Sequence, residues 1–116
     1  MSMSEALDKA GQAKRTGDYA AAKDLYARVL KESSGNVEAH SGLGDIAKAQ
    51  GDLAAAKASY QKALASSPDY GPAMLSLADT EWDMGDRAAA QARYAKIVAA
   101  RGPSAPARAK ERAGTE

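Results

Sequence analysis

The sequence has no cysteine and no phenylalanine, and it contains a single histidine among 116 residues. The absence of cysteine excludes a disulfide framework and thiolate chemistry. The one histidine, His40, has no evident acid or nucleophile beside it to make it a general base, and a metal site needs three or four ligands. We therefore expect a protein that is not an enzyme and that binds no cofactor or metal.

The sequence also has no marked excess of positive or negative charge and no long apolar run. Sixteen basic and 15 acidic residues give a net charge of +1, which provides no field to attract nucleic acid. No apolar run approaches the roughly 20 residues of a membrane-spanning helix, and the start MSMSEALDKA lacks the apolar core of a signal peptide. We expect a cytoplasmic protein, or a fragment of a longer one, that binds no nucleic acid and does not insert into a membrane. The alanine-rich composition suggests a bacterial coding sequence.

What the sequence does contain is one 34-residue unit in three copies. The segments GDYAAAK, GDLAAAK and GDRAAAQ, which begin at Gly17, Gly51 and Gly85, align without a gap and share the pattern Gly-Asp-x-Ala-Ala-Ala. A fixed period of this length is typical of repeat proteins. We divide the chain into unit 1 (3–36), unit 2 (37–70) and unit 3 (71–104) of a single domain, followed by a tail (105–116).

Each unit has the pattern of a helix hairpin. The glycine of the shared Gly-Asp pair accepts the left-handed conformation that ends a helix, and the aspartate caps the next helix. The small residues Ala10, Gly44 and Ala78 allow helices to approach closely, while the recurring tyrosines fill the space between hairpins. The predicted helices run from an N-cap at Ser4 to about residue 15, over 19–32, 37–50 and 53–65, from about 71 to 84, and over 87–100.

The middle unit carries the pattern of a known family. The positions that resemble the tetratricopeptide repeat are held by Leu43, Gly44, Ala56, Tyr60, Ala63 and Pro68. Unit 3 fits less fully because Glu81 replaces a usual tyrosine, and unit 1 is the weakest, with Lys9 at a leucine position. The resemblance covers Met3–Ser104 and implies an all-α, right-handed solenoid of three antiparallel helix hairpins.

Members of this family often end in an extra helix that covers the last hairpin. Here Ser104 stands as a candidate N-cap for a helix over 105–113. However, the tail has no residue larger than alanine on any apolar face, so such a helix would cover the hairpin poorly. We therefore expect a frayed helix or a disordered end rather than a packed C-terminal capping helix.

The resemblance also implies that a peptide partner lies in a concave groove lined by the first helix of each hairpin. Some members hold a partner's terminal carboxylate there, but the positions of that clamp are here Leu7, Gly11, Gly42, Pro72 and Ser76. The clamp is therefore absent. The groove residues carried over by position are Leu7, Gly11 and Lys14 in unit 1, Glu38, Ser41, Asp45 and Lys48 in unit 2, and Leu75, Ser76, Asp79, Trp82 and Asp83 in unit 3.

The groove residues have an acidic character in units 2 and 3. The carboxylates belong to Glu38, Asp45, Asp79 and Asp83, and Lys48 is their main counter-charge. Such a groove favours a protein or peptide partner that carries lysine or arginine, chiefly by steering it and setting its register. The alternative interpretation is that these residues are solubilising charges on exposed helix faces.

Trp82, the only tryptophan, has two interpretations. It is an exposed aromatic anchor of the kind enriched at binding hot spots, or it turns inward to supply the bulk that Glu81 lacks beside it.

We predict a non-catalytic scaffold that binds a protein or peptide in the groove. The alternative is a self-assembling scaffold, a homo-oligomer that stacks through its terminal hairpins. A poorly capped third hairpin would leave apolar surface open around Ile97 and Val98, and head-to-tail or two-fold stacking would cover it.

Overall fold

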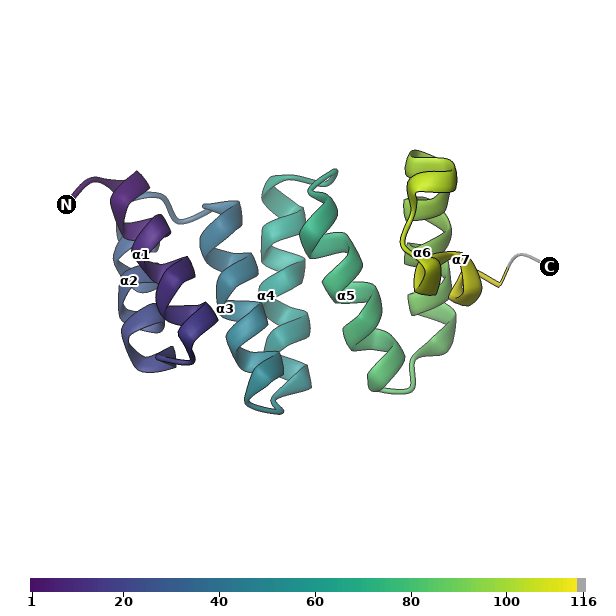
Figure 1. Ribbon diagram of the computed structural model, residues 1–116, viewed down its shortest axis with the longest axis horizontal. Coiled ribbons are helices and arrows are strands. Elements are labelled where there is room, and N and C mark those ends of the chain that lie inside the picture. The colour runs from purple at the N-terminus through teal and green to yellow at the C-terminus, as the bar shows by residue number, and fades with distance from the viewer. Residues whose placement is uncertain (115–116) are drawn as a thin grey trace.

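The computed structural model describes residues 1–114, which form three antiparallel helix hairpins and a short C-terminal segment (Figure 1). Helices are the only regular elements in this range, so the predicted all-α solenoid is confirmed. No helix among these residues is long and apolar enough to span a membrane. The elements are α1 (Met3–Thr16), α2 (Tyr19–Glu32), α3 (Val37–Ala49), α4 (Leu53–Ser66), α5 (Gly71–Asp83), α6 (Arg87–Arg101), the 3-10 turn η1 (Gly102–Ser104) and α7 (Ala107–Arg112).

The hairpins follow one another along the long axis of an elongated molecule that measures 49 × 26 × 23 Å. The first helix α1 and the last helix α7 lie at opposite ends of this axis (Figure 1). Each hairpin packs against its neighbour in the chain, with α2 on α3 and α4 on α5. The first helices α1, α3 and α5 also contact one another in sequence order, and they therefore share one side of the array.

The three Gly-Asp turns have the conformation that the sequence predicts. Gly17, Gly51 and Gly85 have φ angles of +85°, +82° and +88°, which a side chain would strain. In each turn the aspartate carboxylate accepts a hydrogen bond from the backbone N–H three residues later. The repeated sequence thus gives the same helix end and helix start three times.

The first helix begins two residues before its predicted start. Ser2, rather than Ser4, is its N-cap, because Ser2 pairs with a glutamate at the third helical position. The Ser2 hydroxyl accepts from the Glu5 N–H at 3.1 Å, and the Glu5 carboxylate accepts from the Ser2 N–H at 3.4 Å. This reciprocal pair is a capping box, which Ser4 cannot form because Leu7 stands three residues after it.

The recurring tyrosines form the centre of the core. Tyr26, Tyr60 and Tyr94 are 4%, 0% and 0% exposed, so each ring is enclosed by its neighbours. Helical glycines provide the space that two of the rings fill. A Cβ atom on Gly44 would lie 2.6 Å from Tyr60 Cε1, and one on Gly42 would lie 2.2 Å from Tyr26 Cζ. Gly44 therefore accommodates an aromatic ring rather than only a close helix backbone.

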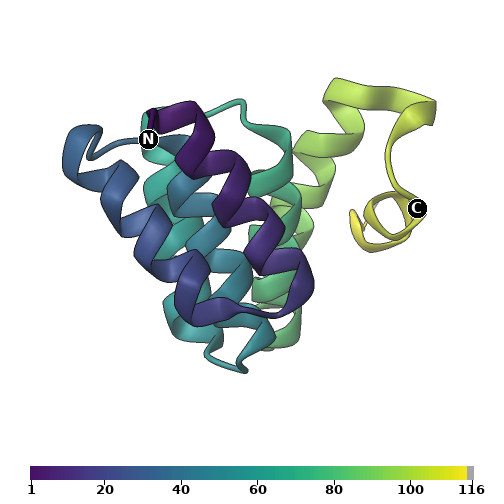
Figure 2. The same cartoon turned by 60° about the vertical axis from the view of Figure 1, so that its left-hand side comes forward.

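The C-terminal cap, residues 102–113, is packed, which corrects the prediction of a frayed or disordered end. Its alanines Ala105, Ala109 and Ala113 are 5%, 0% and 8% exposed and join the cluster around Tyr94 and Ile97. The prediction is wrong because it considered only large apolar side chains, whereas alanine lets α7 approach α6 closely. Figure 2 shows this segment turning back from the end of α6. The predicted tail residues 115–116 lie outside the described range.

Adding one methyl group at Gly44 tests the tyrosine packing. Alanine is intrinsically better than glycine in a helix by up to about 1 kcal/mol, but an overpacked core costs about 1–3 kcal/mol. We expect Gly44→Ala to lower the free energy of unfolding, measured by urea denaturation. Gly11→Ala is the matched control within α1, because its new Cβ meets only Arg15 Nη1 at 3.5 Å. The control should be neutral or stabilising, and equal stability of the two variants would contradict the packing described for Gly44.

Candidate functional site

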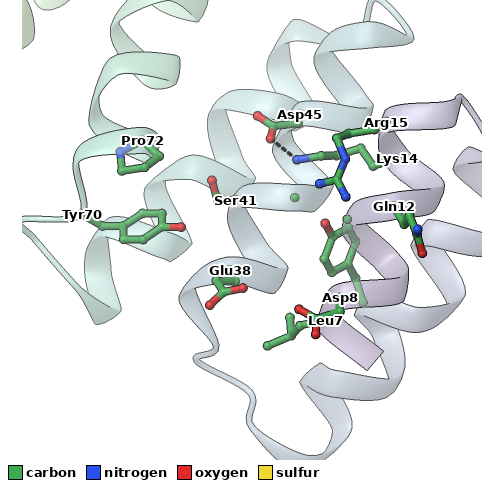
Figure 3. A pocket seen from close by; sticks show the side chains of 13 residues that line it. Leu7, Asp8, Gln12, Lys14, Arg15, Glu38, Ser41, Asp45, Tyr70 and Pro72 are labelled. Carbon is green, nitrogen blue, oxygen red and sulfur yellow. Dashed lines mark hydrogen bonds and ion pairs between the residues drawn. The ribbon is translucent and has the colours of Figure 1, made fainter. Parts of the chain in front are cut away.

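A cavity of about 490 Å³, here called the groove cavity, opens on the side of the array formed by the first helices (Figure 3). It brings together the predicted groove residues of units 1 and 2, except Lys48. Their side chains come from α1 and α3, and Pro72 adds the first turn of α5. The cavity is lined by Leu7, Asp8, Gly11, Gln12, Lys14, Arg15, Tyr26, Glu38, Ser41, Gly42, Asp45, Tyr70 and Pro72.

Several lining residues are not predicted from the sequence. Arg15 lies one position beyond the predicted Lys14, and Tyr26 comes from α2, which the family pattern does not assign to the groove. Tyr70 precedes α5 and borders the cavity opposite α1 (Figure 3). The only sequence feature that singled out Tyr26 is its recurrence with the 34-residue period, and that feature indicates core packing rather than a groove position.

A tyrosine and a lysine fix the carboxylate of Asp45 at the edge of the groove cavity. Tyr60 Oη donates to Asp45 Oδ1 at 2.5 Å, and Lys14 Nζ donates to Asp45 Oδ2 at 2.6 Å. Burial and the hydrogen bond to Asp45 raise the pKa of Tyr60 far above its ordinary value, so this hydroxyl remains a donor. Asp45 is therefore occupied by groups of this chain, one of them from the preceding hairpin.

The same arrangement recurs in unit 3 with a different cation. Tyr94 Oη donates to Asp79, and burial together with this bond raises the pKa of Tyr94 to about 12. Lys48 stands 31 residues before Asp79, as Lys14 stands before Asp45. However, the cation that binds Asp79 is Arg108 of α7, whose Nε and Nη2 donate to the carboxylate at 2.9 to 3.1 Å. This two-oxygen contact is the strong geometry for an arginine and a carboxylate.

These contacts determine the ionisation of Asp79. Burial alone would raise its pKa, but the hydrogen bonds from Arg108 and Tyr94 and the charge of Arg108 outweigh burial, so the pKa lies below its ordinary value. The hydrogen bond to Asp79 in turn raises the pKa of Arg108. The ion pair therefore persists at neutral pH.

Acid should weaken the attachment of α7. Because the folded state lowers the pKa of Asp79, the stabilisation is present above the ordinary aspartate value of about 3.9 and is lost as pH falls below it. We expect the fluorescence of Trp82, which contacts α7, to change as pH decreases below about 4. Asp79→Asn removes the titrating group and should reduce this change. A variant with the same acid transition as the unaltered chain would show that Asp79 does not control the contact.

Trp82 lies half-buried against the C-terminal cap. Its ring meets Tyr94 edge to face, with centroids 6.2 Å apart and an interplanar angle of 70°. The guanidinium carbons of Arg87 and Arg112 lie 4.0 and 4.6 Å from the Trp82 ring centroid. Trp82 is thus neither a bare exposed anchor nor a replacement for the tyrosine that is missing at Glu81.

Glu81 is itself buried, and its carboxylate is paired with basic residues of the neighbouring helices. Only 1% of Glu81 is exposed, and its carboxylate accepts from Arg93 Nε at 2.5 Å and lies 3.8 Å from Lys57 Nζ. An ion pair joining α4, α5 and α6 therefore occupies the position that the family pattern gives to an aromatic ring.

The remaining predicted groove residues lie outside the groove cavity. Lys48, Leu75 and Ser76 are half-buried, while Asp83 is exposed. Leu75 packs with Trp82 against the C-terminal cluster. The structure therefore separates the predicted groove into the cavity of units 1 and 2 and a surface of unit 3 that adjoins the cap.

Fewer of the predicted acidic residues have a carboxylate available to a partner than the sequence indicates. Asp45 and Asp79 are paired with cations of the chain, whereas Glu38 and Asp83 form no ion pair with residues 1–114. Glu38 is also exposed and lines the groove cavity. At the groove cavity the available negative charge thus lies at Glu38 and Asp8, with Arg15 as the opposing charge.

The apolar end predicted at Ile97 and Val98 is largely covered. Ile97 is 6% exposed and belongs to the same cluster as the cap alanines, and Val98 packs against that cluster. Ile97 also lines a second cavity, of about 540 Å³, together with Met74 and the start of α5. The prediction of open surface fails at Ile97 because the cap folds back over α6.

Comparisons with known proteins agree with this architecture. Two family models described as tetratricopeptide repeat match residues 7–71 and 47–113, and the first alone covers more than half of the chain. Among solved structures, the TPR domain of Sgt2 from Aspergillus fumigatus is similar with a TM-score of 0.82 at 24% sequence identity. The similarity covers 95% of this chain and 73% of that one, and it concerns the fold. No curated protein matches the sequence.

Proposed function

This chain belongs to the tetratricopeptide repeat family, whose members are scaffolds for protein–protein interaction, and we propose that it is a non-catalytic scaffold that binds a peptide in the groove cavity. The observation that supports this most directly is the cavity itself. Side chains of α1 and α3, together with Tyr70 and Pro72 at the start of α5, border one concave space. A concave site with placed polar groups is where a ligand binds, and the mainly polar and charged lining of this cavity suits a peptide rather than an apolar small molecule.

The partner that fits this cavity carries a lysine or an arginine. Glu38 is exposed at the cavity without an internal cation, and burial together with Glu38 and Asp45 raises the pKa of the nearby Tyr70. A cationic side chain placed between Glu38 and the Tyr70 ring would gain an ion pair and a cation–π contact. Asp45 contributes less, because Lys14 already neutralises it.

The pattern of charge also suggests how such a peptide is oriented. Arg15 lies on the α1 side of the cavity, with its Nη1 3.5 Å from the place of a Gly11 side chain, and Glu38 comes from α3. The cavity therefore presents a positive and a negative group on different helices. A peptide with a basic residue toward Glu38 and an acidic or carbonyl oxygen toward Arg15 satisfies both, which sets its register.

Reversing the charge of Glu38 tests this proposal. Peptides selected from a random display library against the unaltered chain should be enriched in lysine and arginine. Against Glu38→Lys we expect their Kd to rise about threefold to tenfold, mainly through a slower association rate at low salt, as measured by surface plasmon resonance.

Glu32→Lys is the matched control, because Glu32 is an exposed glutamate at the end of α2 outside the groove cavity. It makes the same change in net charge and should leave the Kd nearly unchanged. Equal losses in the two variants would indicate a nonspecific charge effect and would contradict a site at Glu38.

A further inference from the structure

The surface of unit 3 next to the cap has the geometry of an arginine-binding site. Asp79 receives Arg108 through both carboxylate oxygens, with three donor–acceptor distances of 2.9 to 3.1 Å. Arg112 Nη1 lies 3.8 Å from Asp79 Oδ1 and donates to Tyr94 Oη at 3.1 Å, and its guanidinium lies over the Trp82 ring. A carboxylate beside an aromatic face is the combination that a planar guanidinium uses best.

Both arginines belong to α7, whose own attachment is slight. The helix has six residues, fewer than an isolated helix needs to be stable. Its one buried side chain is Ala109, and the side chains of Arg108 and Arg112 remain 45% and 31% exposed. The ion pairs with Asp79 therefore supply much of what holds α7, and a partner's arginines could replace them. Release of α7 is therefore less costly than opening a hairpin.

Two residues of the arginine site occupy the positions in unit 3 that are equivalent to groove positions in unit 2. Asp79 stands one 34-residue unit after Asp45, and Trp82 stands one unit after Lys48. Asp45 is held by Lys14 of α1, whose helix belongs to a packed hairpin, so this cation stays beside the carboxylate as a competitor for any partner. Asp79 is held by Arg108 of α7, a short helix that lies outside the three hairpins and packs on α6 of the third. Of the two carboxylates, Asp79 is therefore the one whose cation can move away from the hairpins together with its helix.

We propose that Asp79, Trp82 and Tyr94 form an arginine site that α7 occupies in the free chain and that a partner segment occupies after displacing α7. The partner presents two arginines four residues apart, as Arg108 and Arg112 are, because residues at this spacing lie on one face of a helix. This inference rests on the proposed function and specifies its partner: arginine rather than lysine, at a defined spacing.

The test uses the full chain with Arg108→Ala and Arg112→Ala combined, which frees the site. The probe is a fluorescein-labelled synthetic peptide with the sequence of residues 105–113, followed by fluorescence anisotropy. We expect the double variant to bind the peptide at least tenfold more tightly than the unaltered chain, in which α7 competes intramolecularly. Changing both arginines of the peptide to lysine should weaken binding about fivefold or more.

Arg28→Ala and Arg101→Ala combined form the matched control, because both are exposed and neither forms an ion pair with residues 1–114. This control should bind the peptide as weakly as the unaltered chain. Adding Asp79→Asn to the Arg108 and Arg112 variant should abolish the gain. Circular dichroism verifies that the hairpins remain folded in every variant.

Three results would overturn the inference. The first is a folded double variant that binds the peptide no better than the unaltered chain, and the second is equal binding of the lysine peptide. The third is a dimer of the unaltered chain in light scattering that the double variant dissociates, because the occupant would then be α7 of a second copy. None of these results changes the expected effect of Glu38→Lys, so failure of the inference can be distinguished from failure of the proposed function.

Discussion

The contact between a buried tyrosine and an aspartate of the same hairpin connects the core of this protein to its groove. The Tyr60 ring fills the space beside Gly44, and its hydroxyl reaches Asp45 one residue further along α3. A buried hydroxyl without a partner would cost free energy, so the aspartate is part of the packing as well as part of the surface. Lys14 then attaches the same carboxylate to the preceding hairpin. The core packing, the hairpin and its contact with the preceding hairpin therefore all involve Asp45.

The units at the two ends depart from this arrangement in ways that define the binding surface. In unit 1 the position of the aspartate is held by Gly11, so Tyr26 has no carboxylate to donate to and instead lines the groove cavity. In unit 3 the aspartate is present, but its cation comes from the cap rather than from the preceding hairpin. The open cavity and the proposed exchangeable arginine site thus lie where the repeat is incomplete.

The fold could be predicted because its signals are local and repeated. Each Gly-Asp turn specifies a helix end and a helix start, and the helix bounds follow to within two residues. The groove residues on α1 and α3 could be predicted for the same reason, since equivalent positions face the same side. The cap could not be predicted, because alanine packing leaves no pattern of large apolar residues. Nor could the contact of Arg108 with Asp79, which lies outside the 34-residue period and depends on how the chain turns at Gly102.

Charge could be predicted less well than position. The aspartates of units 2 and 3 indicated an acidic groove, but a sequence gives the number of charges and not their partners. Lys14 and Arg108 neutralise Asp45 and Asp79, and they leave Glu38 and Asp8 as the exposed carboxylates at the cavity. Only a charge that is not already paired within the chain is available to select a partner.

The central claim is that a basic peptide binds in the groove cavity, and chemical-shift mapping tests it most directly. A ¹⁵N-labelled chain would be titrated with a selected lysine- or arginine-bearing peptide. We predict saturable shifts of the backbone amides of Gln12, Glu38, Ser41 and Tyr70, with little change around Met74, Ile97 and Ala100 at the second cavity. Shifts confined to the second cavity, or to the exposed face of α2 and α4, would contradict the claim.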